Sequence, residues 1–334
     1  MVSAVIFVAT SCVSPLTGFA FWETNLAYEG ESIYNYLQVK NLSDRTILST
    51  NVLFGVQSVT MKDKGLTGMY YDTALAAPAL ADNANSALIL GMGTGTYARQ
   101  LKQYYPKMNI TGVEIDQKIT DLAGEYFDEP ADIPVTTYDG RAWLAASHDK
   151  YDVIMVDAYQ DITIPFQMSS TEFFTMVREH LNPGGVMVVN MNMISDGQGS
   201  LNEALSDTIA SVFGNGNTLT ADVPNTTNRE LFAKKPGSGS EENSMQQASK
   251  ALNLRETTYE RTGSEDLEWY MEEVASRFRK VNEPDSASTI LTDDKAPVEV
   301  LGMHAIDQII ADEAGPYRQI LKDEGFGGLL RAVQ

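Results

Sequence analysis

Short apolar runs alternate with amphipathic segments along the chain from about residue 82 onward. The runs have the length and composition of buried strands, and the segments between them repeat apolar positions with helical spacing. Strands that alternate with helices predict an α/β fold, in which a doubly wound, mostly parallel sheet is covered by helices. Strands are expected at 87–90, 110–115, 135–138, 151–156 and 186–191, and helices at 97–105, 119–127, 171–181 and 201–213.

A different pattern precedes this core. Apolar and polar positions roughly alternate at 32–39, and further short runs follow at 46–50 and 52–61, which predicts a small antiparallel sheet. The stretch 68–81 is rich in Ala and Leu and predicts a linking helix, although it contains Pro78. The chain therefore begins its folded part with a small β domain ahead of the α/β core.

The region after residue 191 is expected to complete the sheet and then turn polar. Runs at 218–223 and 230–233 would add an antiparallel pair, and the Asn-Pro-Gly-Gly sequence at 182–185 predicts a turn. Residues 234–249 predict a surface loop, followed by helices at 267–281 and 305–322. The expected units are a hydrophobic segment at 1–22, the β domain and linking helix at 23–81, the α/β domain at 82–235, and a polar linker with a helical region at 236–334.

The segment from Val2 to Trp22 carries no charge. It is just long enough to cross a bilayer of about 30 Å as a helix. No basic residue precedes it, so the pattern favours a membrane anchor, or the last span of a larger membrane protein, over an export signal or a buried helix. Lys40 and Arg45 are the first basic residues after it and favour a cytoplasmic main domain, with a soluble cytoplasmic protein as the alternative.

Charge and composition exclude several functions. The 334 residues carry 24 Lys and Arg against 45 Asp and Glu, a formal net charge of −21, and such an acidic chain is not expected to bind nucleic acid. The single cysteine leaves no disulfide within the chain, and three scattered histidines predict no metal site. Chemistry is therefore expected from carboxylates, hydroxyls or a bound cofactor.

The first candidate motif is a glycine-rich turn directly after the first core strand. Gly91, Gly93 and Gly95 would let the backbone approach a ligand closely at the start of a helix. A dinucleotide-binding fingerprint would place a further glycine where Thr96 stands, so NAD is not the best fit. The turn predicts a nucleotide site of some other kind.

Three carboxylates follow the ends of neighbouring strands. Glu114 could accept hydrogen bonds from both hydroxyls of a ribose, or it could be a solvated strand end. Asp139, followed by Gly140, could accept from an adenine amino group or cap the next helix, and Asp157 ends the fourth strand. Ligands of open α/β sheets lie outside the carboxyl ends of the strands, so the three acids should converge on one crevice. They suit a ligand with ribose hydroxyls, amines and positive charge.

Taken together, these residues resemble the polyamine aminopropyltransferases, or spermidine synthases, and especially the forms fused to membrane segments. The resemblance covers about 28–302, and several motifs carry it besides the glycine turn, Asp139-Gly140 and the 151–157 strand. These are Glu31-Ser32-Ile33-Tyr34, Leu53-Phe54-Gly55-Val56-Gln57, Tyr70-Tyr71-Asp72, Val113-Glu114-Ile115-Asp116, Ile164-Pro165, Phe173-Phe174, and Leu291-Thr292-Asp293-Asp294 with Pro297.

The resemblance implies a class I methyltransferase-like Rossmann fold behind the β domain. It implies transfer of the aminopropyl group of decarboxylated S-adenosylmethionine, a co-substrate, to putrescine or another polyamine, releasing methylthioadenosine. The resemblance implies no tightly bound cofactor and no metal. It also implies a homodimer that forms through the β domain. The implied roles are Glu114 on the ribose, Asp139 on the adenine, Gln57 on the nucleoside above the glycine turn, Asp157 as general base, and Tyr70 and Asp161 on the amine.

The sequence also departs from the family pattern. Thr94 stands where an aspartate usually grips the donor's amine, Tyr71 where a histidine is usual, and Phe54 where another aspartate is usual. Two alternatives therefore stay open: an S-adenosylmethionine-dependent methyltransferase, and a non-catalytic membrane protein that binds adenosyl nucleosides or polyamines. Asp293 and Asp294 could cap a helix or face the site.

Overall fold

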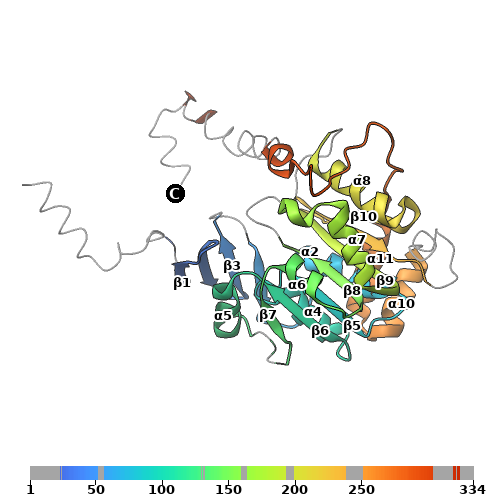
Figure 1. Cartoon of the computed structure of the whole chain (residues 1–334). Coiled ribbons are helices and arrows are strands. Elements are labelled where there is room, and N and C mark those ends of the chain that lie inside the picture. The colour runs from blue at the N-terminus through green and yellow to red at the C-terminus, as the bar shows by residue number, and fades with distance from the viewer. Residues whose placement is uncertain are drawn as a thin grey trace, which may run out of the picture.

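The computed structural model describes residues 23, 25–51, 56–128, 130, 132–158, 164–192, 199–237, 251–303, 319–320 and 322–323. These form two sheets and the helices around them (Figure 1). The uncharged segment 2–22, Phe54, Asp161 and most of the expected helix at 305–322 lie outside the described residues. Within the described part, no helix has both the length and the apolar character that crossing a membrane requires.

The N-terminal sheet is antiparallel, with its four strands in chain order. The single strand expected at 32–39 is wrong, because residues 32–35 form a turn in which the Ser32 hydroxyl accepts from the backbone N–H of Tyr34 and Asn35, at 3.0 and 2.9 Å. Of the strand expected at 52–61, residues 52–55 lie outside the described part, and 58–61 form a strand. The strands are β1 (Leu26–Glu31), β2 (Tyr36–Asn41), β3 (Arg45–Thr50) and β4 (Ser58–Met61).

The linking helix is broken in two, α2 (Tyr70–Ala74) and α3 (Ala76–Leu80). Pro78 has no N–H to donate to the Ala74 carbonyl one turn earlier, and the Tyr97 hydroxyl donates to that oxygen instead, at 3.0 Å. Both helices are buried throughout. The prediction of one continuous helix at 68–81 is therefore wrong. The helix breaks at Leu75, next to the Ala74 carbonyl that receives no hydrogen bond from Pro78.

The main sheet has eight strands in the order β12-β10-β11-β9-β8-β5-β6-β7, and β9-β8-β5-β6-β7 are parallel. This confirms the expected α/β fold, and β10 and β11 pair antiparallel as expected. The turn expected at 182–185 lies inside strand β9, where the register shifts and Gly184 takes a φ of +77°. The strands are β5 (Ser86–Leu90), β6 (Asn109–Glu114), β7 (Val135–Thr137), β8 (Tyr151–Val156), β9 (Leu181–Asn192), β10 (Thr218–Asp222), β11 (Asn228–Lys234) and β12 (Arg279–Lys280).

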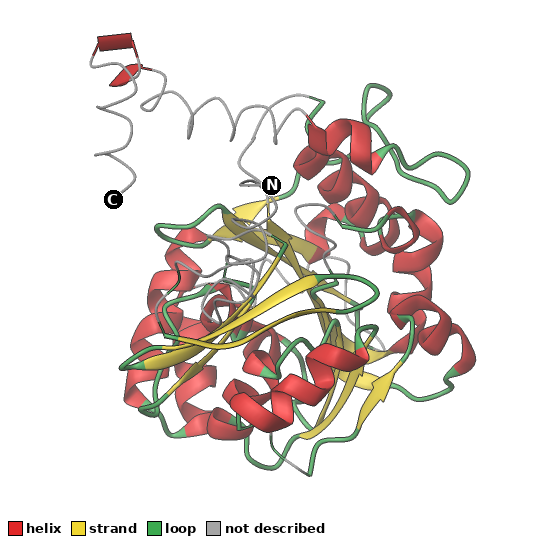
Figure 2. Cartoon of the chain, turned by 90° about the vertical axis from the view of Figure 1, so that its left-hand side faces the viewer, coloured by secondary structure: helices red, strands yellow, loops and turns green. Residues whose placement is uncertain are grey.

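Helices cover both faces of the main sheet (Figure 2). One face packs against α2, α3, α4 (Thr96–Tyr104), α10 (Ala251–Thr262) and α11 (Glu265–Arg277). The other packs against α6 (Gly140–Ala146), α7 (Thr171–His180) and α8 (Leu201–Phe213). The helix expected at 267–281 ends at Arg277, and the next residues add β12 to the sheet instead.

Helix α5 (Gln117–Tyr126) joins the two sheets. Its apolar residues Ile119 and Leu122, with Phe127 just after it, pack on Leu37 and Leu48 of the small sheet. Asp116 caps this helix and also accepts from the Ser32 hydroxyl and the Asn35 amide, at 2.5 and 3.1 Å. The small sheet is therefore fixed next to the carboxyl end of β6, where the candidate site begins.

Candidate active site

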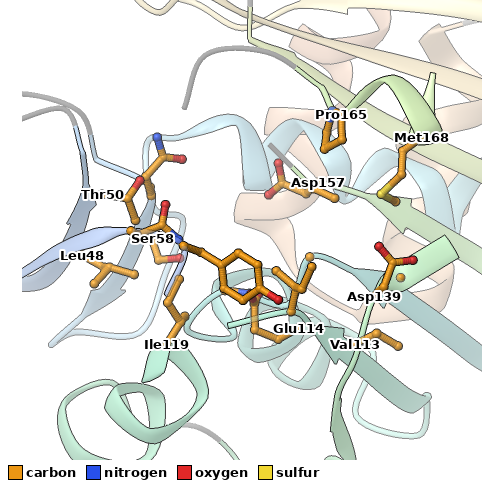
Figure 3. A pocket seen from close by; sticks show the side chains of 18 of the residues that line it. Leu48, Thr50, Ser58, Val113, Glu114, Ile119, Asp139, Asp157, Pro165 and Met168 are labelled. Carbon is orange, nitrogen blue, oxygen red and sulfur yellow. The ribbon is translucent and has the colours of Figure 1, made fainter. Parts of the chain in front are cut away.

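One cavity of about 300 Å³ opens at the carboxyl ends of β5, β6 and β8 and is closed on one side by the N-terminal sheet (Figure 3). Most of the candidate residues line it together. Gly95 is not among its lining residues, and Asp161 lies outside the described part of the chain. The candidates on the wall are Gln57, Tyr70, Gly91, Gly93, Glu114, Asp139, Gly140 and Asp157, and the wall also includes Tyr34, Leu48, Thr50, Tyr71, Tyr138, Pro165 and Met168.

The glycine turn needs its glycines for two reasons. Gly91 and Gly93 have φ values of +88° and +56°, which side chains disfavour. A Cβ at Gly91 would also lie 2.3 Å from the Asp157 carbonyl oxygen, so the turn touches the end of β8 directly. Gly95, with a φ of +82°, instead starts helix α4. Thr94 is fully buried, and its hydroxyl has no hydrogen-bond partner among the described residues.

Glu114 is fixed at the end of β6 by backbone donors. Its two oxygens accept from the N–H of Gly93, at 2.7 Å, and of Asp116, at 3.0 Å. Only 6 % of the residue is exposed, so it is not a solvated strand end. Burial raises the pKa of Glu114, and the backbone donors act against that rise. Its carboxylate is therefore oriented before any ligand arrives.

Asp139 caps helix α6, because its Oδ1 accepts from the Ala142 N–H at 2.7 Å. The cap uses one oxygen, while the residue still lines the cavity. A Cβ at Gly140 would lie 3.6 Å from the Met168 methyl carbon, an ordinary van der Waals distance, so the segments that carry these two residues lie close together.

Asp157 follows β8 directly and is held by two side-chain donors. The Tyr70 hydroxyl donates to Oδ2 at 2.7 Å, and the Asn190 amide donates to Oδ1 at 3.0 Å. Burial raises the pKa of Asp157 to about 6, and both hydrogen bonds act to lower it. A carboxylate with a raised pKa in a cavity is a candidate general base.

Two tyrosines on α2 hold the wall beside Asp157. Their rings lie 4.0 Å apart, and the Tyr71 hydroxyl donates to the Gln57 carbonyl oxygen at 2.7 Å. Burial raises the pKa of Tyr71, so this hydroxyl stays protonated. Tyr71 therefore joins the linking helix to the segment that carries Gln57, a contact that the sequence did not predict.

Sequence reasoning missed Asn190. It is a polar residue within the apolar run of β9, and it is almost fully buried. A buried amide in an apolar strand needs partners, and here it donates to Asp157 and accepts from the Asn228 amide at 2.9 Å. The available signal was an asparagine inside the apolar run 186–191, near the carboxyl end of the strand.

Asp293 does not line the cavity. It accepts two hydrogen bonds from the Arg141 guanidinium, at 2.7 and 2.6 Å, and one from the Ser170 hydroxyl, at 2.5 Å. Arg141 also donates to the Gln167 carbonyl at 2.7 Å. Asp294 is exposed. The late Thr-Asp-Asp segment therefore joins Arg141 of α6 to Ser170, and Arg141 itself holds η2 (Phe166–Met168), a short 3₁₀ helix on the cavity wall.

The charge of the wall is one-sided. Glu114, Asp139 and Asp157 line the cavity, and no Lys, Arg or His is among its lining residues within the described part of the chain. The described residues also contain no group of three or more His, Cys, Asp or Glu that could hold a metal ion. The site is arranged to attract cations.

Comparison with known proteins agrees with this architecture. Residues 69–234 match the spermine/spermidine synthase domain model. The chain is 99 % identical over all 334 residues to a "Probable polyamine aminopropyl transferase" of Bifidobacterium longum strain NCC 2705, and covers 75 % of that protein. It is 28 % identical over 209 residues to a polyamine aminopropyltransferase of Vibrio vulnificus, covering 60 % of this chain and 69 % of the relative.

Solved structures share the fold. A probable spermidine synthase from Corynebacterium glutamicum superposes with a TM-score of 0.56 at 22 % identity, covering 80 % of this chain and 99 % of that one. The spermidine synthase of Thermotoga maritima gives 0.51 at 19 % identity, covering 64 % and 74 %. The fold and site define a Rossmann-like, methyltransferase-like α/β transferase. The chain belongs to the spermine/spermidine synthase family of polyamine aminopropyltransferases.

Proposed function

We propose that this chain moves the aminopropyl group of decarboxylated S-adenosylmethionine to putrescine or another polyamine, releasing methylthioadenosine, with Asp157 as general base. One observation carries the proposal: Asp157 shares a cavity with Glu114 and Asp139, which suit a nucleoside. Family membership supports the same reaction. A base beside a nucleoside pocket is the arrangement that this transfer needs.

The chemical step balances without a metal or a redox partner. The nitrogen lone pair of the acceptor attacks the aminopropyl carbon bonded to sulfur, a C–N bond forms, and the C–S bond breaks. The bonding pair moves to the sulfonium sulfur, which becomes the neutral thioether of methylthioadenosine. Because a protonated amine has no lone pair, the acceptor must give up a proton, and Asp157 would accept it; the raised pKa of Asp157 supports this role. The remaining rate enhancement over the uncatalysed reaction comes from alignment of the two substrates.

The nucleoside would occupy the part of the cavity over β5, β6 and β7. Glu114 would accept from the ribose hydroxyls, because its oxygens are fixed at the strand end. Asp139 would accept from the adenine amino group through the oxygen that does not cap α6, and Gln57, just before β4, would contact the nucleoside. Tyr70 would line the amine path through its bond to Asp157. Asp161 is assigned to the amine from the sequence alone.

Two features favour this reaction over its alternatives. A methyltransferase has to bind the carboxylate of S-adenosylmethionine, and the described residues that line the cavity include no basic side chain for it. A non-catalytic binding protein could tie up Asp157 in an ion pair, but Asp157 instead takes neutral donors, Tyr70 and Asn190. The carboxylate therefore stays available as a base.

The test is a turnover assay of the full chain with decarboxylated S-adenosylmethionine and a panel of monoamines, diamines and polyamines. Release of methylthioadenosine with at least one amine is expected. A parallel reaction with S-adenosylmethionine measures methyl transfer. If methyl transfer occurs and no amine causes methylthioadenosine release, the chain is a methyltransferase and this proposal is wrong. If the chain binds the nucleoside or the amines but catalyses neither reaction, it is a binding protein.

We also propose, from the sequence alone, that residues 2–22 anchor the chain in a membrane with the catalytic part in the cytoplasm. Fractionation of cells that express the full chain and a variant lacking residues 2–22 tests this, because only the full chain should sediment with membranes. A homodimer through the N-terminal sheet is a further proposal, and light scattering of the purified chain measures it.

A further inference from the structure

Three polar side chains form a row on one face of the main sheet. In β9 and β11, Asn190 is registered opposite Glu230. The pairing of β8 with β9, continued by one pair beyond Val156 and Val189, places Asp157 beside Asn190. All three share the face that carries Val188 and Phe232, under α2. The row therefore runs from Asp157 across two strands at the ligand edge of the sheet.

Glu230 is the one member of this row that the proposed reaction does not use. It is fully buried, and neither carboxyl oxygen has a hydrogen-bond partner among the described residues. Burial raises the pKa of Glu230, and the charge of Asp157 raises it further, so both effects favour the protonated acid. Burial of a carboxyl group whose two oxygens have no hydrogen-bond partner costs folding free energy, so its presence requires an explanation. No described cation lies near enough to supply one.

The surroundings of Glu230 point toward an amine. Two strand spacings separate it from Asp157, which is about 10 Å between backbones, on the scale of an aliphatic chain with an amino group at each end. Helix α2, which carries Tyr70, contacts β9 and β11 and covers the row. Glu230 does not line the cavity in the free chain, so an acceptor would have to reach it beneath α2.

We propose that Glu230 binds the second, non-reacting ammonium group of the acceptor and thereby selects diamines and polyamines over monoamines. This inference rests on the proposed aminopropyl transfer and adds a residue to it. On binding, the Glu230 carboxyl loses its proton to solvent and forms an ion pair with the ammonium, which keeps all its protons. Asp157 then acts on the nitrogen at the other end, so the two acids hold the two ends of one acceptor.

The experiment compares 1,4-diaminobutane with butylamine, which lacks only the second amino group. Glu230→Gln keeps the shape but cannot ionise, and it should lower the ratio of kcat/KM for the diamine to that for the monoamine on the order of 100-fold. Asp207→Asn is the matched control, because Asp207 is a nearly buried acid on α8, on the other face of the sheet, whose pKa burial also raises. Its ratio should equal that of the unaltered chain.

Calorimetry supplies a second readout that a merely structural role would not move. Diamine binding, measured in buffers of different ionisation enthalpy, should release about one proton more from the unaltered chain than from Glu230→Gln. An unchanged ratio, an equal loss for both amines, or an equal proton count would each overturn the assignment. If the unaltered chain releases no methylthioadenosine with any amine, the proposed function fails instead, so the two failures are distinguishable.

Discussion

Burial of Asp157 sets both its basicity and its cost to the fold. Its pKa is about 6 in the folded chain against an ordinary value of 3.8, mainly because burial disfavours the charged form. Between these values the folded chain holds a proton that the unfolded chain has lost. Stability is therefore lost as the pH rises from about 4 to 6, and the loss above pH 6 is about 3 kcal/mol.

Asp157→Asn should consequently lower the activity of the chain and raise its stability. The amide stays neutral, so the free energy of unfolding at pH 7.5 should rise by up to about 3 kcal/mol, and the gain should shrink toward pH 4. Loss of the base should lower kcat by about 10²- to 10⁴-fold. Denaturant unfolding at both pH values and methylthioadenosine release measure the two effects. Binding of methylthioadenosine should stay nearly intact, and its loss in proportion to kcat would place Asp157 in the nucleoside site.

The Tyr70 hydroxyl should control the pH profile through Asp157. Its hydrogen bond stabilises the carboxylate and lowers the pKa, so Tyr70→Phe should move the acidic limb of kcat/KM from about pH 6 to higher pH. The profile is measured with saturating donor and one amine for both chains, which cancels the titration of the amine itself. A limb that stays at the same pH in Tyr70→Phe would mean that another group controls it.

At the scale of elements, the cavity wall depends on segments far apart in the chain. Arg141 at the start of α6 holds both the Gln167 carbonyl in η2 and Asp293, which comes over a hundred residues later. Asp293 also accepts from the Ser170 cap of α7. The cavity wall that Gly140 and Met168 form beside Asp139, where the adenine is proposed to bind, therefore depends on this ion pair rather than on local sequence.

Arg141→Ala and Asp293→Ala should each raise the KM for the donor by roughly tenfold and leave kcat little changed. Each substitution removes a contact that holds the cavity wall beside Asp139, and neither alters Asp157. The double variant should lose little more than either single one, with a coupling energy of about 1–2 kcal/mol. Steady-state kinetics of all four chains measures the cycle. Arg255→Ala, which removes another Arg–carboxylate contact, to Glu268 between α10 and α11, is the control. Additive effects at Arg141 and Asp293 would contradict a shared role.

Local sequence predicted the main elements better than their limits. The strands of the α/β core followed from apolar runs, and the carboxylates followed from their positions just after those strands. Pro78 removes the N–H that would bond to the Ala74 carbonyl, but local sequence did not reveal that the Tyr97 hydroxyl, on another helix, donates to that oxygen at the break. Asn190 and Glu230 entered the row beside Asp157 only through strand register, which one sequence does not specify. Contacts between distant segments therefore account for most of what sequence reasoning missed.

At the scale of the molecule, the acidity of the chain has a local and a general part. The local part is the wall with Glu114, Asp139 and Asp157 and without a described basic residue. The general part is the net charge of −21 carried by the whole chain. Both attract cations, but salt screens exposed charges beyond about 10 Å at 0.1 M much more than it screens buried ones. Ionic strength therefore separates the two contributions.

Raising the salt concentration should weaken polyamine use in proportion to the charge of the amine. Between about 0.02 and 0.5 M NaCl, the KM of a triamine should rise more steeply than that of a diamine, because general attraction scales with substrate charge. Steady-state kinetics with saturating donor measures the slopes. Methylthioadenosine is uncharged, so its affinity, measured by calorimetry over the same range, should stay constant and is the control. Equal slopes for the two amines would assign their recognition to the buried acids alone.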